Sequence, residues 1–328
     1  MENRLVSQKE VSIKPRISLA DHGPILALIL LVIIGSVMSP AFLTKGNIFN
    51  VLTQISVLGI GALGMTYMMI AGFIDLSIFG VLSLINVLFV GLQRTIGTME
   101  AVIIMILIGL VMGLINGTIL RLIKGDFGAS IMITYGTGTI FGALALMYTH
   151  GFSIRANDDP FFLWFGTGQV LGIPVPIVIL FVCAVIFHIV LRYTTFGRSL
   201  YLTGANPEAA RLSGIPIDRI RTIAFMVSGA SVALGGLIVS SQTVSASPVV
   251  GTGYEINVIA AVAIGGTSLN GGEGTIIRTI IGVLLIGVLS NLFIMVGLST
   301  FDQMMAKGLI IIAALIMDKR KQKGIRKG

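Results

Sequence analysis

The sequence predicts an all-α membrane protein, a polytopic helical bundle with about ten transmembrane helices. Hydrophobic residues make up 55% of the 328 positions and charged residues only 11%, whereas soluble domains contain roughly 25% charged residues. Apolar stretches of about 18 or more residues recur along the whole chain, which is typical of membrane-spanning helices. A β-barrel would instead show short segments of alternating polarity.

Ten apolar segments define the expected organisation of the chain. They form a transmembrane domain over residues 24–318, which lies between a cytoplasmic N-terminal tail (1–23) and a basic cytoplasmic tail (319–328). The expected spans are 24–43, 51–71, 75–93, 99–122, 127–149, 174–194, 223–241, 255–269, 276–297 and 303–318.

The distribution of basic residues predicts the orientation of these spans. With the N-terminus inside, 18 of the 22 basic residues fall on the cytoplasmic side and only Lys45, Arg94 and Arg155 fall outside. Positive charge beside spans favours the cytoplasmic side of a membrane. We therefore expect both termini in the cytoplasm. This distribution also explains the net charge of +8, so no nucleic-acid partner is expected.

Two polar residues in the first half are candidates to line a path through the bundle. Asp75 lies at or just inside the membrane boundary, where an ionisable group is a functional candidate by default. Together with Ser77, it could equally cap the helix that follows. Asn116 lies within a span and could instead hydrogen-bond to a neighbouring helix.

The main segment expected on the extracytoplasmic side is 150–173. Its aromatic residues are typical of a belt at headgroup depth, and a docking surface for an external partner is the alternative. The aromatic residues are Phe161, Phe162, Trp164 and Phe165.

The stretch "GANPEAARLSGI" (204–215) predicts a short, capped cytoplasmic helix. Asn206 can accept from the backbone N–H of Ala209, and Pro207 suits the first helical position. Gly214 can end the helix in a left-handed conformation. Such a helix, with an Ala-Ala face and a Leu212 anchor, suits a groove on another protein, although it could also be a plain connector. The candidate contact residues are Gly204, Asn206, Pro207, Glu208, Ala209, Ala210, Arg211, Leu212, Ser213 and Gly214.

A glycine cluster at 264–274 interrupts the apolar sequence of the second half. Broken helices at membrane depth are tolerated where they face protein or a cavity. Glu255 begins the preceding span as a path candidate or a cap, and Asn291 lies in the following span as a path candidate or a link between helices. Since each half has a glycine-rich break followed by a span with an asparagine, an internal pseudo-repeat is a hypothesis.

Several function classes are disfavoured by the sequence. Cys183 is the only cysteine, and His22, His150 and His188 show no metal-ligand spacing. No set of residues suggests a nucleophile, an acid–base pair or a metal centre. A transporter subunit is expected rather than an enzyme.

Five stretches carry a resemblance to a known family. The segment "GRSLYLTGANPEAARLSGIPIDRIR" (197–221) resembles the cytoplasmic coupling loop of sugar-type ABC importer permeases, in the ribose and branched-chain amino-acid branch. The segments 228–237, 251–275 and 307–318 resemble the same family in the same order, as does 47–77 with its "IDLS" core.

The resemblance implies a permease subunit that moves a monosaccharide or sugar-like solute. It implies three partners besides membrane lipid: ABC ATPase subunits, a second permease subunit and a periplasmic substrate-binding protein. The helix 206–213 would then be the coupling helix, seated in the ATPase. The chain itself has no G-x-x-x-x-G-K-[ST] stretch, so no cofactor is expected on it, and ATP and Mg would bind to the partner ATPase.

The chain departs from the family pattern at three places. Phe73 and Phe79 stand where glycines are typical, Arg278 replaces another glycine, and 125–136 lacks the usual proline-containing stretch. We expect the two rings to narrow or reshape a translocation path. One hypothesis is that the chain is half of a heterodimer. The alternative function is an ion-gradient-driven secondary transporter of a small polar solute.

Overall fold

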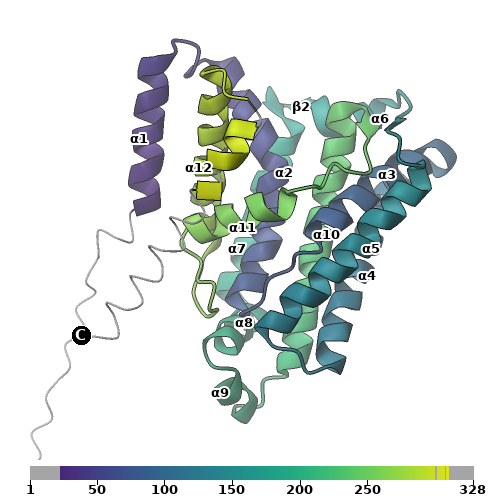
Figure 1. Cartoon of the computed structure of the whole chain (residues 1–328), viewed down its shortest axis with the longest axis vertical. Coiled ribbons are helices and arrows are strands. Elements are labelled where there is room, and N and C mark those ends of the chain that lie inside the picture. The colour runs from purple at the N-terminus through teal and green to yellow at the C-terminus, as the bar shows by residue number, and fades with distance from the viewer. Residues whose placement is uncertain (1–22, 300, 307, 310–328) are drawn as a thin grey trace, which may run out of the picture.

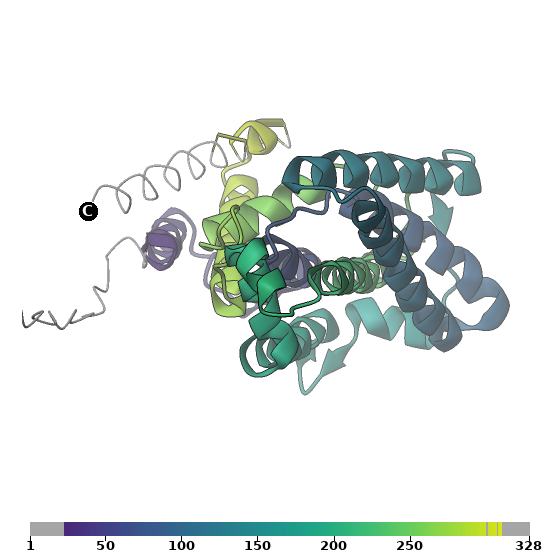
Figure 2. The ribbon, with the colours of Figure 1, turned by 90° about the horizontal axis from the view of Figure 1, so that it is seen from below.

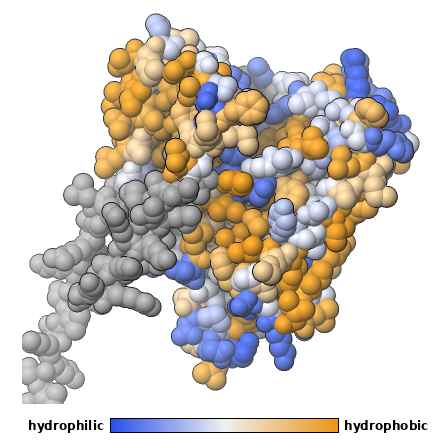
Figure 3. Space-filling model, in the orientation of Figure 1, coloured by the Kyte–Doolittle hydropathy of each residue, from blue (hydrophilic) through white to orange (hydrophobic). Residues whose placement is uncertain are grey.

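The computed structural model is a bundle of α-helices and confirms the all-α membrane class. It describes residues 23–299, 301–306 and 308–309. Within these residues, seven helices are long and apolar enough to cross a membrane. They lie side by side along the long axis of the molecule (Figure 1). Figure 3 shows apolar residues mainly over the flanks and hydrophilic residues gathered towards both ends, as expected for a chain surrounded by lipid.

The helices and strands follow one another in a simple order. The seven long helices are α2 (Lys45–Ile70), α3 (Ile78–Ile96), α4 (Thr98–Leu122), α5 (Phe127–Thr149), α7 (Val175–Tyr193), α10 (Ile217–Thr243) and α12 (Ile276–Met295). The shorter helices are α1 (Gly23–Met38), α6 (Pro160–Thr167), α8 (Thr195–Ala205), α9 (Pro207–Leu212) and α11 (Tyr254–Ile264). Two small antiparallel sheets pair β1 (Ile154–Arg155) with β4 (Ser245–Ala246), and β2 (Gln169–Val170) with β3 (Ile173–Pro174).

Two helices begin part-way along their neighbours, after a non-helical segment. Residues 71–77 follow α2 and lead to α3; there Asp75 accepts a hydrogen bond from Ser228, near the middle of α10. Residues 244–253 follow α10 and lead to α11, where the Tyr254 hydroxyl donates to the backbone oxygen of Val57, midway along α2. Both segments therefore reach the interior of the bundle from opposite ends.

These segments belong to two units that run in opposite directions. The first unit is α2, α3 and α4, and the second is α10, α11 and α12. The two leading helices pack on each other, α2 also packs on α11 and α12, and α10 also packs on α3 and α4. Figure 2 shows α10 nearly end-on, in green, among the other helices. The leading helix of each unit therefore packs on all three helices of the other unit. Such packing is typical of inverted repeats in transporters and agrees with the pseudo-repeat hypothesis.

Close contact between α4 and α10 depends on glycine. Gly109, Gly113 and Gly117 follow one another at intervals of four residues on α4 and face α10. A Cβ at Gly109 would lie 2.6 Å from the backbone oxygen of Gly229, and one at Gly117 would lie 2.8 Å from the Cα of Thr222. Small residues at such spacing let two helix backbones approach each other.

Several expected spans are corrected by the structure. The span over 255–269 is wrong as a full crossing, because α11 has 11 residues, about 16 Å of helix. The span over 24–43 contains only the 16 residues of α1. The span over 75–93 begins at Ile78, so Asp75 lies outside it. Of the span 303–318, only 303–306 and 308–309 fall within the described residues, and both tails lie almost wholly outside them.

The aromatic belt expected at 150–173 is only partly correct. The segment forms a cap over one end of the bundle, where Asp159 accepts from the backbone N–H of Phe162 (2.9 Å) and starts α6. Phe162 is fully buried and packs on Phe89 with 5.4 Å between ring centroids. Phe165 is also buried, whereas Trp164 is exposed and stacks with Phe161. Two of the four aromatic residues therefore belong to the core.

Candidate functional site

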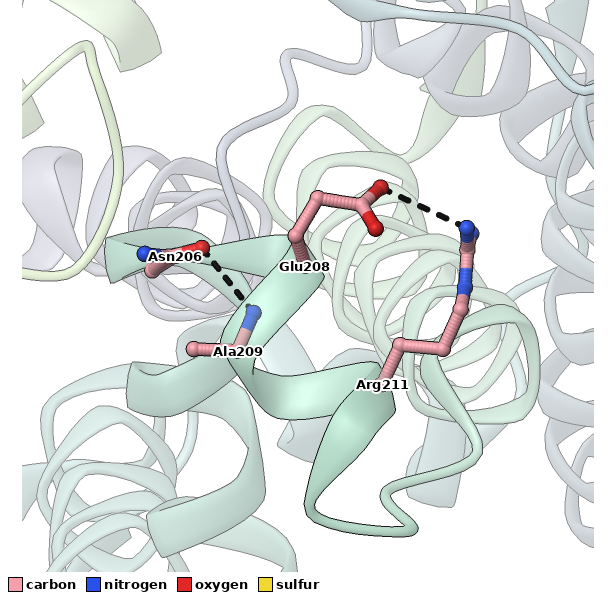
Figure 4. A network of polar contacts seen from close by, with 4 residues as sticks. All are labelled: Asn206, Glu208, Ala209 and Arg211. Carbon is pink, nitrogen blue, oxygen red and sulfur yellow. Dashed lines mark hydrogen bonds and ion pairs between the residues drawn. The ribbon is translucent and has the colours of Figure 1, made fainter.

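The predicted short helix is present as α9, with the predicted cap at its start (Figure 4). The side-chain oxygen of Asn206 accepts from the backbone N–H of Ala209 at 3.0 Å. Pro207 occupies the first helical position, where a missing N–H costs nothing. Glu208 and Arg211, both exposed, form an ion pair at 3.4 Å, and such surface pairs contribute little to stability.

The end of α9 is fixed by a glycine in the left-handed region. Gly214 has a φ of +78°, and its N–H donates to the backbone oxygen of Arg211 at 3.0 Å. The N–H of Ile215 donates to the oxygen of Ala210 at 3.1 Å. These two bonds form a Schellman motif. Both ends of a six-residue helix are thus capped, although helices this short are marginal alone.

One side of α9 is free for contact with another molecule. Leu212 is 89% exposed and Ala209 is exposed, whereas Ala210 is buried against the rest of the chain. The expected Ala-Ala face is therefore wrong, because adjacent helical residues point about 100° apart. The outer surface combines Pro207, Ala209 and the apolar Leu212.

Helix α8, which the sequence analysis did not anticipate, holds α9 against the bundle. Gly204 lies at a junction with the end of α2 and the loop 265–275. At this junction, the backbone N–H of Gly272 donates to the oxygen of Ile70 at 2.9 Å. A Cβ at Gly204 would lie 2.6 Å from the nitrogen of Gly272 and would overlap the oxygen of Ile70. The backbones of α8, α2 and the loop 265–275 can therefore come this close only because residue 204 is glycine.

A second bond ties α8 to the same loop. The Tyr201 hydroxyl donates to the backbone oxygen of Gly274 at 2.6 Å. Burial raises the pKa of Tyr201 above its ordinary value, so the hydroxyl remains a donor. The glycine cluster at 264–274 therefore packs onto the base of α9, a role that its sequence position alone did not indicate.

Asp75 joins the segment 71–77 to α10. One carboxylate oxygen accepts from the backbone N–H (3.0 Å) and hydroxyl (2.5 Å) of Ser77, and the other accepts from the Ser228 hydroxyl (3.0 Å). Asn116 donates to the Ser77 hydroxyl at 2.7 Å. Asp75 and Asn116 are almost completely buried. For Asn116, this contact favours the interpretation of a link between helices. Asp75 bonds both to Ser77 at the start of α3 and to Ser228 of α10, so it combines the expected contact at the helix start with a link to α10 that was not expected.

Asn291 makes a reciprocal pair with Asn47. Each side-chain amide donates to the other's oxygen, at 3.1 and 2.9 Å, and the pair connects α12 to α2. Glu255 lies in the first turn of α11 with one buried carboxylate oxygen that has no hydrogen-bond partner among the described residues. Neither interpretation of Glu255 is decided by these contacts.

The two phenylalanines contact neighbouring elements of the bundle. Phe73 is buried, and the guanidinium of Arg221 lies 4.3 Å from its ring centroid. Phe79 is half-buried and packs against Gly138 and Tyr135 of α5. That the two rings narrow or reshape a path stays a prediction. Arg278 lies in the first turn of α12, beside Gly265.

The sequence analysis missed a set of uncharged polar residues around a cavity of about 440 Å³. They include Gln54 of α2, Gln242 of α10 and Asn257 of α11, which are far apart in the sequence. The sequence signal that could have indicated this cavity is the presence of uncharged amide side chains within apolar helices. In the part of the chain that the structure describes, no cluster of His, Cys, Asp or Glu could hold a metal ion.

Comparison with known proteins identifies the class of this chain. Residues 47–315 match the family described as the permease component of the branched-chain amino acid transport system. The chain belongs to this permease family. The resemblance inferred from residues 197–275 is therefore confirmed.

The permease is similar to curated transport proteins over nearly its whole length. It is 41% identical to the ribose import permease protein RbsC of Bacillus subtilis, over 91% of the chain and 92% of the relative. It is 34% identical to the L-arabinose transport system permease protein AraH of Escherichia coli, over 93% and 92%. No solved structure matches the permease at a significant level. These relatives are named as permeases, which agrees with the prediction of a transport subunit rather than an enzyme.

Proposed function

We propose that the permease is the membrane subunit of an ATP-driven importer for a monosaccharide or sugar-like solute. A separate ABC ATPase would bind α9, and a second permease subunit would complete the pathway. ATP and Mg would bind to the ATPase. The permease would lie in a bacterial inner membrane with both termini and α9 on the cytoplasmic side.

The observation that carries this proposal is the exposed, doubly capped α9 together with its junction at Gly204. A partner that moves Leu212 would move α8, and α8 touches both the end of α2 and the loop 265–275. Those two elements lead to the segment 71–77 and to α11 and α12. A small displacement at α9 would therefore reach both inverted units.

The opposite end of the bundle suits an external partner. Leu171 is 99% exposed and Phe152 is 74% exposed, and both lie in the cap between α5 and α7. Figure 1 shows this cap, with α6 and β2, at the far end from α9. A periplasmic substrate-binding protein would deliver the solute there.

Binding of the ATPase subunit can be tested with variants of α9. Ala209→Arg places a long charged side chain on the exposed surface, and Gly214→Pro is incompatible with a φ of +78°. Both variants should insert into the membrane but lose co-purification with the ATPase subunit. Leu171→Arg, at the other end, is the matched control and should keep it. Co-purification that survives both α9 changes would contradict the proposal.

The alternative of an ion-gradient-driven transporter has its own test. Asp75, the clearest candidate for a charge relay, has each carboxylate oxygen occupied by hydrogen bonds, which does not favour that alternative. Uptake of a sugar by the permease alone in liposomes without nucleotide would support it instead.

A further inference from the structure

A cavity of about 440 Å³ lies between α2, α10, α11 and α12. It lies towards the end of the bundle opposite α9, because Gln242 occupies the last turn of α10 and Asn257 the first turn of α11. This is the side on which a solute from outside would arrive. The polar residues around the cavity are Gln54, Gln242, Tyr254, Asn257, Ser290 and Gln303.

The cavity wall offers hydrogen bonds without charge. None of the described residues that line it is Asp, Glu, Lys or Arg. The Nε2 of Gln242 is buried and has no hydrogen-bond partner within the described chain. Asn257 uses its Nδ2 on the backbone oxygen of Gly253 (3.0 Å), which leaves its side-chain oxygen to face a ligand. A buried donor without a partner costs free energy, and rotation of the Gln242 side chain to bring Nε2 into the cavity would let a ligand hydroxyl accept from it.

The rest of the wall is apolar. Ile55, Leu82 and Ile286 line the cavity together with other aliphatic side chains. A polyhydroxylated ring presents C–H faces and a rim of hydroxyls, so it matches a wall that alternates aliphatic groups with amides. An ionised solute would lose hydration there without gaining a counter-charge.

We propose that this cavity is a transient binding site for an uncharged, polyhydroxylated solute. Gln242 and Asn257 determine its specificity by bonding ligand hydroxyls, and the absence of charge rejects sugar acids, sugar phosphates and amino sugars. The proposal rests on the proposed import function, which brings the solute to the cavity from outside. The binding of a neutral solute in the cavity can nevertheless be tested on the permease alone.

The test measures protection of a cysteine in the cavity. Cys183→Ser removes the natural thiol, and Ser290→Cys adds one of similar size in the wall. The purified full-length variant is treated with a hydrophilic maleimide while D-ribose, L-arabinose, D-xylose or D-galactose is added. At least one of these sugars should slow labelling, whereas D-gluconate, D-ribose 5-phosphate and D-glucosamine should not. Ile33→Cys, on the exposed surface of α1, should show no protection.

Replacing the amide side chains by leucine then tests whether Gln242 and Asn257 bind the sugar. Gln242→Leu and Asn257→Leu should each raise the half-protecting sugar concentration about tenfold, the loss of one or two hydrogen bonds. Gln169→Leu, in exposed β2 outside the cavity, should leave it unchanged. Protection by none of the neutral sugars, equal protection by the charged compounds, or unchanged protection in both leucine variants would overturn the proposal. Because no ATPase is present in this experiment, such a result would not contradict the importer proposal. The importer proposal is tested separately, by co-purification of the α9 variants with the ATPase subunit.

Discussion

The backbone N–H of Gly272 donates to the backbone oxygen of Ile70 at 2.9 Å, which fastens the loop 265–275 to the end of α2. Gly204 of α8 lies directly against this bond. Three segments that are far apart in the sequence therefore share one contact point next to α9. Through this point α8 contacts both inverted units at once, in addition to its packing on α7 and α10.

Gly204→Ala should disrupt this junction. The added methyl overlaps backbone atoms rather than flexible side chains, and overpacking of this kind costs roughly 1–3 kcal/mol. We expect a lower unfolding temperature in detergent and, in a reconstituted importer, slower ATP-driven uptake of the labelled sugar that protects the cavity cysteine. Gly46→Ala, where the methyl meets open space, should behave as wild type. Equal unfolding temperatures for the two variants would show that the junction can yield.

The bond between Asp75 and Ser228 should appear as an energetic coupling. Asp75→Ala and Ser228→Ala each leave one partner buried without its bond, at about 1–3 kcal/mol, so their effects on the free energy of unfolding should not add. The control pair replaces Ser228→Ala with Ser231→Ala, since the Ser231 hydroxyl bonds only within α10, to Val227. Additive effects in the first cycle would mean that Asp75 does not hold the segment 71–77.

The reciprocal pair of Asn47 and Asn291 should stabilise the contact of α2 with α12. Asn291→Leu should lower the free energy of unfolding by about 0.5–2 kcal/mol, the range for hydrogen bonds between membrane helices. The double change Asn47→Leu with Asn291→Leu should recover part of this loss, because no buried amide is then left alone. Unfolding in detergent at graded denaturant concentrations measures both quantities. A double variant less stable than the sum of the single ones would refute this account.

The orientation of α9 can be measured directly. In a Cys183→Ser background, Arg211→Cys should react with an impermeant maleimide in inside-out vesicles and remain unlabelled in intact cells. Leu171→Cys, at the opposite end of the bundle, should show the reverse pattern after the outer membrane is made permeable. Labelling of Arg211→Cys from outside would remove the basis for ATPase binding.

The features that depend on neighbouring residues in the sequence were predictable. Asn206, Pro207 and Gly214 specify both ends of α9 through local backbone chemistry, and the long spans follow from hydropathy. The half-length helix α11 was missed because an apolar extended segment and an apolar helix have the same composition. The segment 255–269 expected at its position therefore joined the helix, which ends at Ile264, to the first residues of the glycine cluster.

The features that depend on tertiary contacts were not predictable from one sequence. Helix α8 owes its place to Tyr201 and Gly204, whose partners lie more than 60 residues away. Gln54, Gln242 and Asn257 line one cavity only after three helices pack together. The neighbours of Phe73 and Phe79, among them Arg221 and Tyr135, also come from distant parts of the sequence.

The inverted arrangement of α3 and α11 has an electrostatic consequence. Each of these helices starts inside the bundle, so the positive end of its macrodipole lies away from water, where it is poorly screened. An acidic residue lies near each of these starts: Asp75 three residues before the first residue of α3, and Glu255 in the first turn of α11. The two inverted units therefore share one feature in an otherwise apolar chain, an acidic side chain next to the positive end of a helix dipole.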